Sequence, residues 1–215
     1  MKKRILPILT ALLLQNAWAE PKLPIGEFSR HQLEGWEHKS ADGETQYQLE
    51  IIDDLTVLKA NSHNAASGMF KEQRVDLEQT PYLNWSWRIA NRLDGGIIEQ
   101  TKAGDDYVAR IYVVAKCGLA FWQTKAINYV WASNTVKETV WPNAYAGEQL
   151  MMLALRGPEA NLNVWHAEKR NVRNDMHKMF GEDIRYIDVV ALMTDTDNSQ
   201  GHAAAYYGDI WFSKE

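Results

Sequence analysis

Aspartates give this sequence its most oxygen-rich segments. Asp105 and Asp106 are adjacent, Asp195 and Asp197 flank a threonine, and Asp209 lies near the end of the chain. A hard cation such as Ca²⁺ takes about 6 to 8 oxygen ligands, several of them carboxylates. The sequence therefore predicts a calcium site formed by Asp195, Asp197 and Asp209. The spacing does not fit an EF-hand loop, and the same residues could instead form a turn in which aspartates bond their own backbone.

A second group of polar residues alternates with apolar ones along three segments that are typical of strands. Because side chains alternate across a strand, the polar members of each segment share one face. Guanidinium groups hold carboxylates in paired hydrogen bonds, so a face of this kind could bind an acidic sugar. It could equally close on itself as internal ion pairs. The candidate ligand-binding residues are Arg88, Asp106, Arg110, Tyr112, Glu168 and Arg170.

The same residues suggest a route to catalysis. Asp106 and Glu168 could serve as acid and base at a glycosidic bond, where the separation of two carboxylates determines the outcome. The chain has none of the motifs of serine hydrolases, zinc proteases, P-loop enzymes or dinucleotide-binding enzymes. The sequence leaves open whether the protein is an enzyme.

Aromatic residues form a third group, with nine Trp and nine Tyr against five Phe. Trp and Tyr combine an apolar face with a polar tip, so they suit both a core and a sugar-binding surface. We expect Trp85 and Trp87 to fill a core. Trp122, Trp131 and Trp141 lie near expected loops or strand ends, so they are predicted to form exposed platforms.

The elements that must position these residues are mostly strands. One helix is expected over 172–180, because its apolar residues follow helical spacing between Asn171 and Gly181 as caps. About ten short strands and one helix predict an all-β fold, an antiparallel two-sheet β-sandwich of the jelly-roll type. The expected strands are 47–52, 55–60, 68–77, 82–90, 106–116, 126–132, 136–141, 149–155, 163–170, 186–194 and 206–212.

The first 19 residues have the pattern of a secretory signal peptide. Three basic residues precede a short apolar run, and Ala17 to Ala19 form a small-residue cleavage site. We expect cleavage near Ala19, a single domain over 20–215, and a periplasmic or secreted location. No transmembrane segment is expected in the mature chain. The full sequence has a single cysteine, Cys117, which cannot form an intramolecular disulfide, and a net charge of −5, which argues against nucleic-acid binding.

Several short motifs together resemble a bacterial exported family catalogued as domain of unknown function 3047. That resemblance implies export and a single domain, and it implies no reaction. The motifs are W-S-W-R at 85–88, G-D-D-Y-V-A-R-I-Y-V-V at 104–114, N-Y-V-W at 128–131, E-K-R-N-V at 168–172, F-G-E at 180–182, D-T-D-N at 195–198 and Y-G-D-I at 207–210.

A looser likeness concerns architecture. The Gly35-Trp36 pair, the 65–70 run A-A-S-G-M-F and the final strand resemble carbohydrate-binding modules of the galactose-binding-like jelly-roll type. Such modules often hold a structural calcium between the first and last strands. The likeness implies a calcium role for Asp209 and a glycan ligand.

Together these features predict an exported, carbohydrate-binding-type β-sandwich of the cell envelope that holds a polar or acidic glycan on an Arg/Asp/aromatic face. One alternative is a hydrolase or lyase that acts on polysaccharides with the same face. The other is a structural or partner protein of the envelope, whose protein partner the sequence does not name. Calcium is the only cofactor expected.

Overall fold

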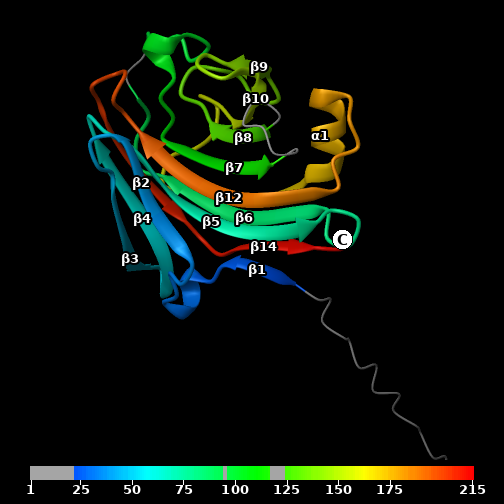
Figure 1. The fold of residues 1–215 in the computed structure, drawn as a ribbon. Helices are drawn as coiled ribbons and strands as arrows, with labels where there is room; N and C mark the ends of the chain where they lie inside the picture. Colours follow the sequence, from blue (N-terminus) through cyan, green and yellow to red (C-terminus); the bar gives the residue numbers. More distant parts are fainter. Residues whose placement is uncertain (1–21, 94–95, 117–123) are drawn as a thin grey trace, which may run out of the picture.

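A computed structural model describes residues 22–93, 96–116 and 124–215, which form two stacked β-sheets and one short α-helix (Figure 1). This confirms the expected all-β sandwich. The strands are β1 (Leu23–Gly26), β2 (Trp36–Asp42), β3 (Gln46–Ile52), β4 (Leu55–His63), β5 (Ala66–Asp76), β6 (Tyr82–Ile89), β7 (Ala109–Ala115), β8 (Lys125–Trp131), β9 (Val140–Asn143), β10 (Gly147–Arg156), β11 (His166–Asn171), β12 (Tyr186–Asp195), β13 (His202–Tyr207) and β14 (Ile210–Ser213).

Each sheet contains seven strands. The first sheet has the order β3-β4-β13-β6-β14-β1, with β11 also paired to β6. The second sheet has the order β2-β5-β12-β7-β8-β10-β9. The α-helix α1 (Val172–Phe180) and two short 3-10 helices, η1 (Phe28–Arg30) and η2 (Lys102–Gly104), complete the described elements.

One strand pair departs from the expected antiparallel arrangement. Strand β10 runs parallel to β8 and antiparallel to β9. After β8 the chain passes over one strand position to form β9, and β10 then fills the position between them. Among the strands that the structure describes, every other pair is antiparallel.

The last expected strand, 206–212, is two strands. Strand β13 ends at Tyr207 and β14 begins at Ile210, and both pair with β6. Gly208 makes the break: its N–H donates to the carbonyl oxygen of Ser86 at 2.9 Å, and a Cβ at this position would collide with the Ser86 side chain. The break directs Asp209 away from the ladder.

Two local predictions are confirmed. Strands β3 and β4 form a hairpin in which Asp53 and Asp54 have φ of 51° and 63°, the left-handed pair that tight hairpin turns require. Helix α1 has the expected bounds. The Asn171 side chain accepts a hydrogen bond from the N–H of Asn174 at 3.0 Å, and Gly181, with φ of 70°, ends the helix.

The space between the sheets is filled by aromatic and aliphatic side chains, among which Trp85 and Trp87 are buried as expected. The prediction that Trp131 and Trp141 are exposed platforms is wrong, because they are 0% and 6% exposed. Strand β8 extends to Trp131, so strand alternation points this ring inward beside Tyr129. Trp122, Cys117 and the expected signal peptide lie outside the described residues.

Two strands were not expected from the sequence. Strand β1 is short, and β2 has the composition W-E-H-K-S-A-D with six exposed residues after a half-buried Trp36. Neither shows the apolar alternation of a half-buried strand. Their positions come from pairing with β14 and β5. Among residues 22–93, 96–116 and 124–215, no helix is long and apolar enough to cross a membrane.

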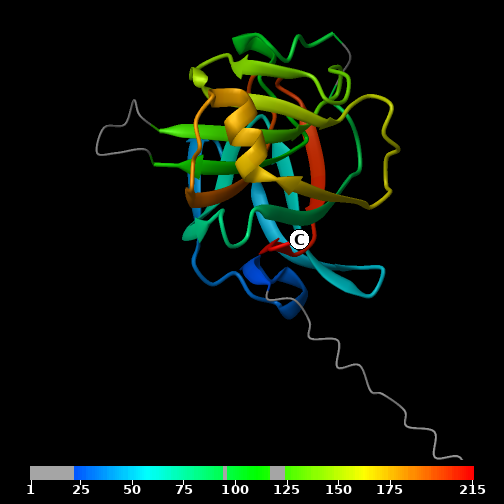
Figure 2. The ribbon, with the colours of Figure 1, turned by 90° about the vertical axis from the view of Figure 1, so that its right-hand side faces the viewer.

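Helix α1 stands at one end of the sandwich (Figure 2) and is held there by a buried carboxylate. Val172 and Met176 pack into the core. Asp175, 4% exposed, accepts hydrogen bonds from the Tyr129 hydroxyl at 2.9 Å and from Arg170 Nε and Nη2 at 2.9 and 2.8 Å. One carboxylate thus joins the helix to both sheets.

Asp175→Ala is expected to lower the free energy of unfolding by about 3 kcal/mol, because it leaves a partly buried guanidinium and a buried hydroxyl without their acceptor. Urea unfolding measures this. Asp183→Ala is the matched control, since Asp183 pairs with Arg173 at 2.7 Å on the surface. Equal effects of the two substitutions would contradict the role assigned to Asp175.

Candidate functional site

The six candidate ligand-binding residues do not share one face. Strand β7 places Arg110 and Tyr112 on the outer face of the second sheet, while the other candidate strands belong to the first sheet. Strand β6 places Arg88 on the outer face of the first sheet, opposite Tyr206 of β13. The expectation of a common face is wrong, because alternation within a strand does not say to which sheet the strand belongs.

Glu168 and Arg170 point between the sheets, where they form internal ion pairs. Glu168 lies opposite Trp85 of β6, accepts the indole N–H of Trp87 at 3.0 Å and receives Arg156 Nε at 2.6 Å. Arg170 is bound to Asp175. Glu168 and Arg170 therefore follow the alternative expectation, in which the polar residues form internal ion pairs.

The expected acid–base pair is also separated. Asp106 lies in the loop before β7, and its carboxylate accepts the N–H groups of Asn198 and Ser199 at 3.3 and 2.5 Å. Glu168 lies inside the sandwich beside Trp87. Neither Asp106 nor Glu168 lines any of four pockets on the described part of the chain.

Arg88 makes a surface arrangement of its own. Its guanidinium carbon lies 5.6 Å from the centroid of the Tyr206 ring, and Nη1 lies 3.4 Å from Asp53 Oδ2. The Asp53 side chain is 70% exposed, so this ion pair contributes little to the stability of the fold. Arg88 and Arg110 therefore lie on different sheets and share no face.

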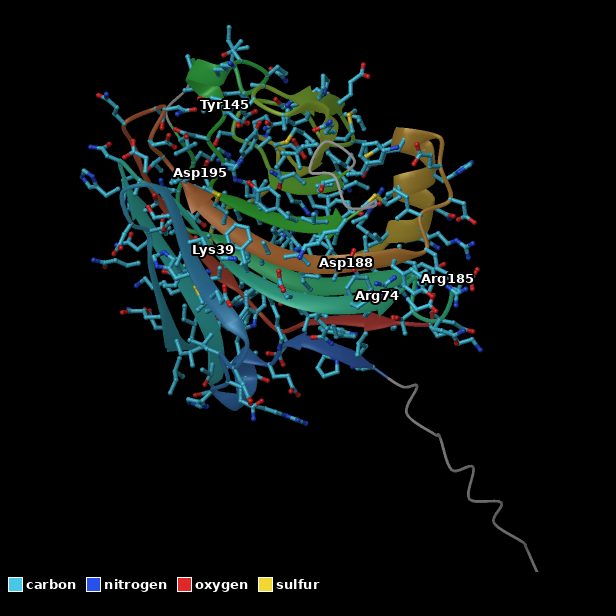
Figure 3. All side chains as sticks on the ribbon, viewed as in Figure 1. Lys39, Arg74, Tyr145, Arg185, Asp188 and Asp195 are labelled. Atoms are coloured by element: carbon cyan, nitrogen blue, oxygen red, sulfur yellow. The ribbon has the colours of Figure 1, made fainter. Side chains whose placement is uncertain are left out.

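A pocket opens on the outer face of the second sheet, at the end where β12 finishes and β7 begins. Figure 3 shows Tyr145 and Asp195 at this end, while Arg74, Arg185 and Asp188 lie at the other. The pocket has a volume of about 310 Å³. Its lining consists of Ala41, Asp42, Ala66, Asp105, Arg110, Tyr145, Met193, Asp195, Asp197 and Asn198.

Asp195 and Arg110 form the floor of this pocket. Asp195 is 1% exposed and Arg110 is 4% exposed. Arg110 Nη2 donates to Asp195 Oδ2. The other carboxylate oxygen of Asp195, Oδ1, accepts the N–H of Tyr107 at 3.1 Å. The guanidinium carbon lies 5.1 Å from the Tyr107 ring centroid and 5.5 Å from that of Tyr112. Two rings and one carboxylate thus fix the only basic side chain in the lining.

Carboxylates dominate the rest of the pocket. Oxygen atoms of Asp106, Asp195 and Asp197 lie within 4.8 Å of one another, whereas Asp209 is bound to Ser29 beside β1. The expected trio of calcium ligands is therefore divided, and calcium binding stays a prediction. Burial raises the pKa of the Asp197 carboxyl, and the charge of Asp106 raises it further.

Asp105 and Tyr145 complete the walls. Asp105 accepts two hydrogen bonds from Asn143 Nδ2, at 3.0 and 3.2 Å, and burial raises the pKa of its carboxyl against the opposing effect of Arg110. Tyr145, in the loop between β9 and β10, is 59% exposed. Its hydroxyl donates to the Lys102 carbonyl oxygen at 3.1 Å and lies 3.3 Å from Asn198 Oδ1.

Sequence reasoning found Arg110 and most of the aspartates but missed Tyr145 and Asn143. Both lie in the run P-N-A-Y-A-G, whose residue types favour a turn. An aromatic residue within such a turn has little chance of burial. That signal was available, but nothing in the sequence indicates that this turn meets the loop after β12.

The fold and the pocket define an all-β sandwich protein with a polar, carboxylate-rich pocket on the outer face of one sheet. The chain belongs to the family described as protein of unknown function DUF3047, whose model matches residues 34–211. The resemblance seen in the sequence is thereby confirmed. A comparison with curated proteins finds no match.

Similar solved structures include a non-crystalline cellulose-specific carbohydrate-binding module, CBM28, with TM-score 0.46 and 11% identity, covering 89% of this chain and 97% of that one. The family 30 module of a Clostridium thermocellum cellulosomal cellulase has TM-score 0.44 and 9% identity, covering 91% and 94%. The glycoside hydrolase domain of Endo-D from Streptococcus pneumoniae R6 has TM-score 0.40 and 9% identity, covering 84% and 22%. This chain thus spans under a quarter of that hydrolase structure.

Arg110→Ala is expected to lower the free energy of unfolding by about 3 to 5 kcal/mol, because it leaves Asp195 buried without its cation. Chemical denaturation measures the loss. Arg88→Ala is the control, since Arg88 pairs with the exposed Asp53. A stable Arg110→Ala variant would show that the fold does not need this ion pair.

Asp197→Asn is expected to raise the melting temperature near pH 7. The raised pKa means that the folded protein holds the Asp197 proton more tightly than the unfolded chain does, so ionised Asp197 costs stability. This cost is present above the folded pKa and disappears below the ordinary value of 3.8. Thermal unfolding across this pH range, with a chelator present, should show the advantage vanish in acid. Asp54→Asn, on the exposed hairpin turn, should show no such trend.

Proposed function

We propose that this protein binds a neutral glycan in the pocket between Tyr145 and Asp195. The observation that carries the proposal is an exposed aromatic ring standing beside a set of fixed polar groups on one sheet face. A sugar ring has an apolar face and a rim of hydroxyl groups. An aromatic wall complements the first, and carboxylate, amide and guanidinium groups complement the second.

The polar groups are held in place before a ligand arrives. Arg110 is fixed by Asp195, and Asp105 is fixed by Asn143. Each carboxylate keeps lone pairs beyond those already used, since an ionised carboxylate has about four acceptor sites. Groups that are ordered in advance bind with less loss of conformational entropy. This favours a specific polyhydroxyl ligand over loose surface adsorption.

The charge of the pocket favours a neutral glycan over an acidic one. Asp42, Asp105, Asp195 and Asp197 line it together with one cation, Arg110. That cation is already paired with Asp195. A uronate or sulfate group would therefore meet like charges in a partly desolvated site, where repulsion is poorly screened. Of the polar or acidic glycan expected from the sequence, we therefore retain a polar, uncharged one.

The proposed setting is outside the cytoplasm. It is supported by the signal-peptide pattern of residues 1–19. Binding without turnover is the activity proposed, because the expected acid and base, Asp106 and Glu168, lie in different parts of the sandwich.

Tyr145→Ala is expected to weaken the binding of a neutral hexasaccharide by about tenfold or more, which corresponds to about 1.4 kcal/mol. The melting temperature should change little, because this ring is mostly exposed and the two hydrogen bonds of its hydroxyl lie at the surface. Isothermal titration calorimetry with hexasaccharides of β-1,4-glucose, β-1,3-glucose, β-1,4-mannose and β-1,4-galactose measures the affinity. Tyr206→Ala, on the outer face of the first sheet, is the matched control.

An acidic probe tests the charge argument separately. A hexasaccharide of galacturonic acid should bind more weakly than the best neutral one, and more weakly still at low salt. Tighter binding of the galacturonate probe would contradict a neutral ligand. Absence of binding by all four neutral hexasaccharides would contradict the pocket as a glycan site.

A further inference from the structure

A larger groove lies on the other side of the molecule, along the outer face of the first sheet. Its volume is about 590 Å³. Strands β1 and β14, which carry it, lie at the bottom of Figure 1, away from the loops around Tyr145 and Asp195 at the top. The lining residues are Lys22, Pro24, Gly26, Glu27, Ser29, Arg30, Asp209, Ile210 and Trp211.

Trp211 provides an aromatic surface in this groove. In register it lies opposite Pro24 of β1 and Asn84 of β6, so its ring belongs to the outer face while Phe212 points inward. On the β1 side the groove is lined by Pro24 and Gly26, which have small side chains or none. A Cβ on Gly26 would lie 2.8 Å from Phe28 Cζ, so the glycine is required by close packing.

Polar groups surround the ring on the η1 side. Asp209 accepts the N–H of Ser29 at 2.8 Å and its hydroxyl at 2.5 Å, which fixes the carboxylate and leaves lone pairs free. Arg30, whose side chain is 71% exposed, lies 2.8 Å from Glu27. The Lys22 ammonium lies 4.7 Å from the Trp211 ring centroid.

The charges balance within the groove, with Lys22 and Arg30 against Glu27 and Asp209. A purely anionic or cationic ligand therefore gains little net attraction. The combination offers one flat apolar surface with both hydrogen-bond donors and acceptors at its edge. That is the complement of a pyranose ring, whose hydroxyl groups donate and accept around an apolar face.

From these contacts we propose that the Trp211 groove is a second glycan-binding site, independent of the pocket beside Tyr145. A sugar residue stacks on Trp211, donates hydroxyl hydrogens to Asp209 and accepts hydrogen bonds from Arg30 and Lys22. Lys22 must leave the ring face to make room. Among the described residues it has no carboxylate within ion-pair distance, so this movement breaks no salt bridge.

Two sites on opposite outer faces make the protein bivalent. One molecule would then hold two glycan chains, or two stretches of one chain that wraps around the sandwich. Linked sites gain apparent affinity for a long polymer without any new contact. The affinity for a polysaccharide should therefore exceed that for its own hexasaccharide.

The test is an indole NMR titration of the protein from residue 20 onward, with tryptophan labelled by ¹⁵N. The four neutral hexasaccharides named above serve as probes, and calorimetry with the best binder gives the stoichiometry. We expect the Trp211 indole signal to shift and two equivalents to bind. Trp211→Ala should weaken one of the two equivalents by about tenfold or more, and Trp211→Phe should retain most of the affinity.

Tyr145→Ala separates the two sites. If Trp211 responds unchanged in that variant, the groove binds independently and the inference is supported even should the Tyr145 pocket fail. If only the Tyr145 pocket binds, with no Trp211 shift for any probe, the inference is overturned and the proposed function stands. If Trp211→Ala lowers the melting temperature, Arg30→Ser tests the same groove at an exposed side chain, and unchanged stoichiometry in that variant would overturn the inference.

Discussion

Aromatic contact between β6 and β8 is the interaction on which the sandwich depends. The ring centroids of Trp85 and Tyr129 lie 5.6 Å apart, and those of Trp87 and Trp131 lie 5.7 Å apart. Each pair joins one sheet to the other. Large rings bury much apolar area and pack in tilted arrangements that favour attraction between them. Because the chain has one cysteine, an intramolecular disulfide cannot join the two sheets, and this aromatic layer holds them together instead.

The same layer explains where the internal charges lie. Rings fill the middle of the sandwich, and the ion pairs occupy its margin near β11 and α1. Glu168 serves both regions, because it accepts the Trp87 indole and an Arg156 nitrogen. Buried charges persist only with partners. The polar groups that are free to meet a ligand are consequently those on the outer faces, around Arg110 and around Trp211.

Features set by neighbouring residues could be predicted from the sequence. The two-aspartate turn at 53–54, the helix at 172–180 and the inward direction of Trp85 and Trp87 depend on local geometry and alternation. Sheet membership is different, because it depends on pairing between strands that are far apart in the chain. Arg88 and Arg110 have the same local pattern, yet β6 and β7 belong to opposite sheets. The sequence therefore indicated several of the residues that line the pocket, but it did not indicate which of the candidate residues lie together.

The composition of β2 and β9 also has a consequence for the second sheet as a whole. These two strands are its edges, where unpaired backbone groups can recruit a strand from another molecule. Strand β2 carries Glu37 and Lys39, both exposed, and β9 is only four residues long and contains Pro142, which has no N–H to donate. The charges of β2 and the short length and proline of β9 therefore discourage edge-to-edge growth of the sheet, and with it aggregation.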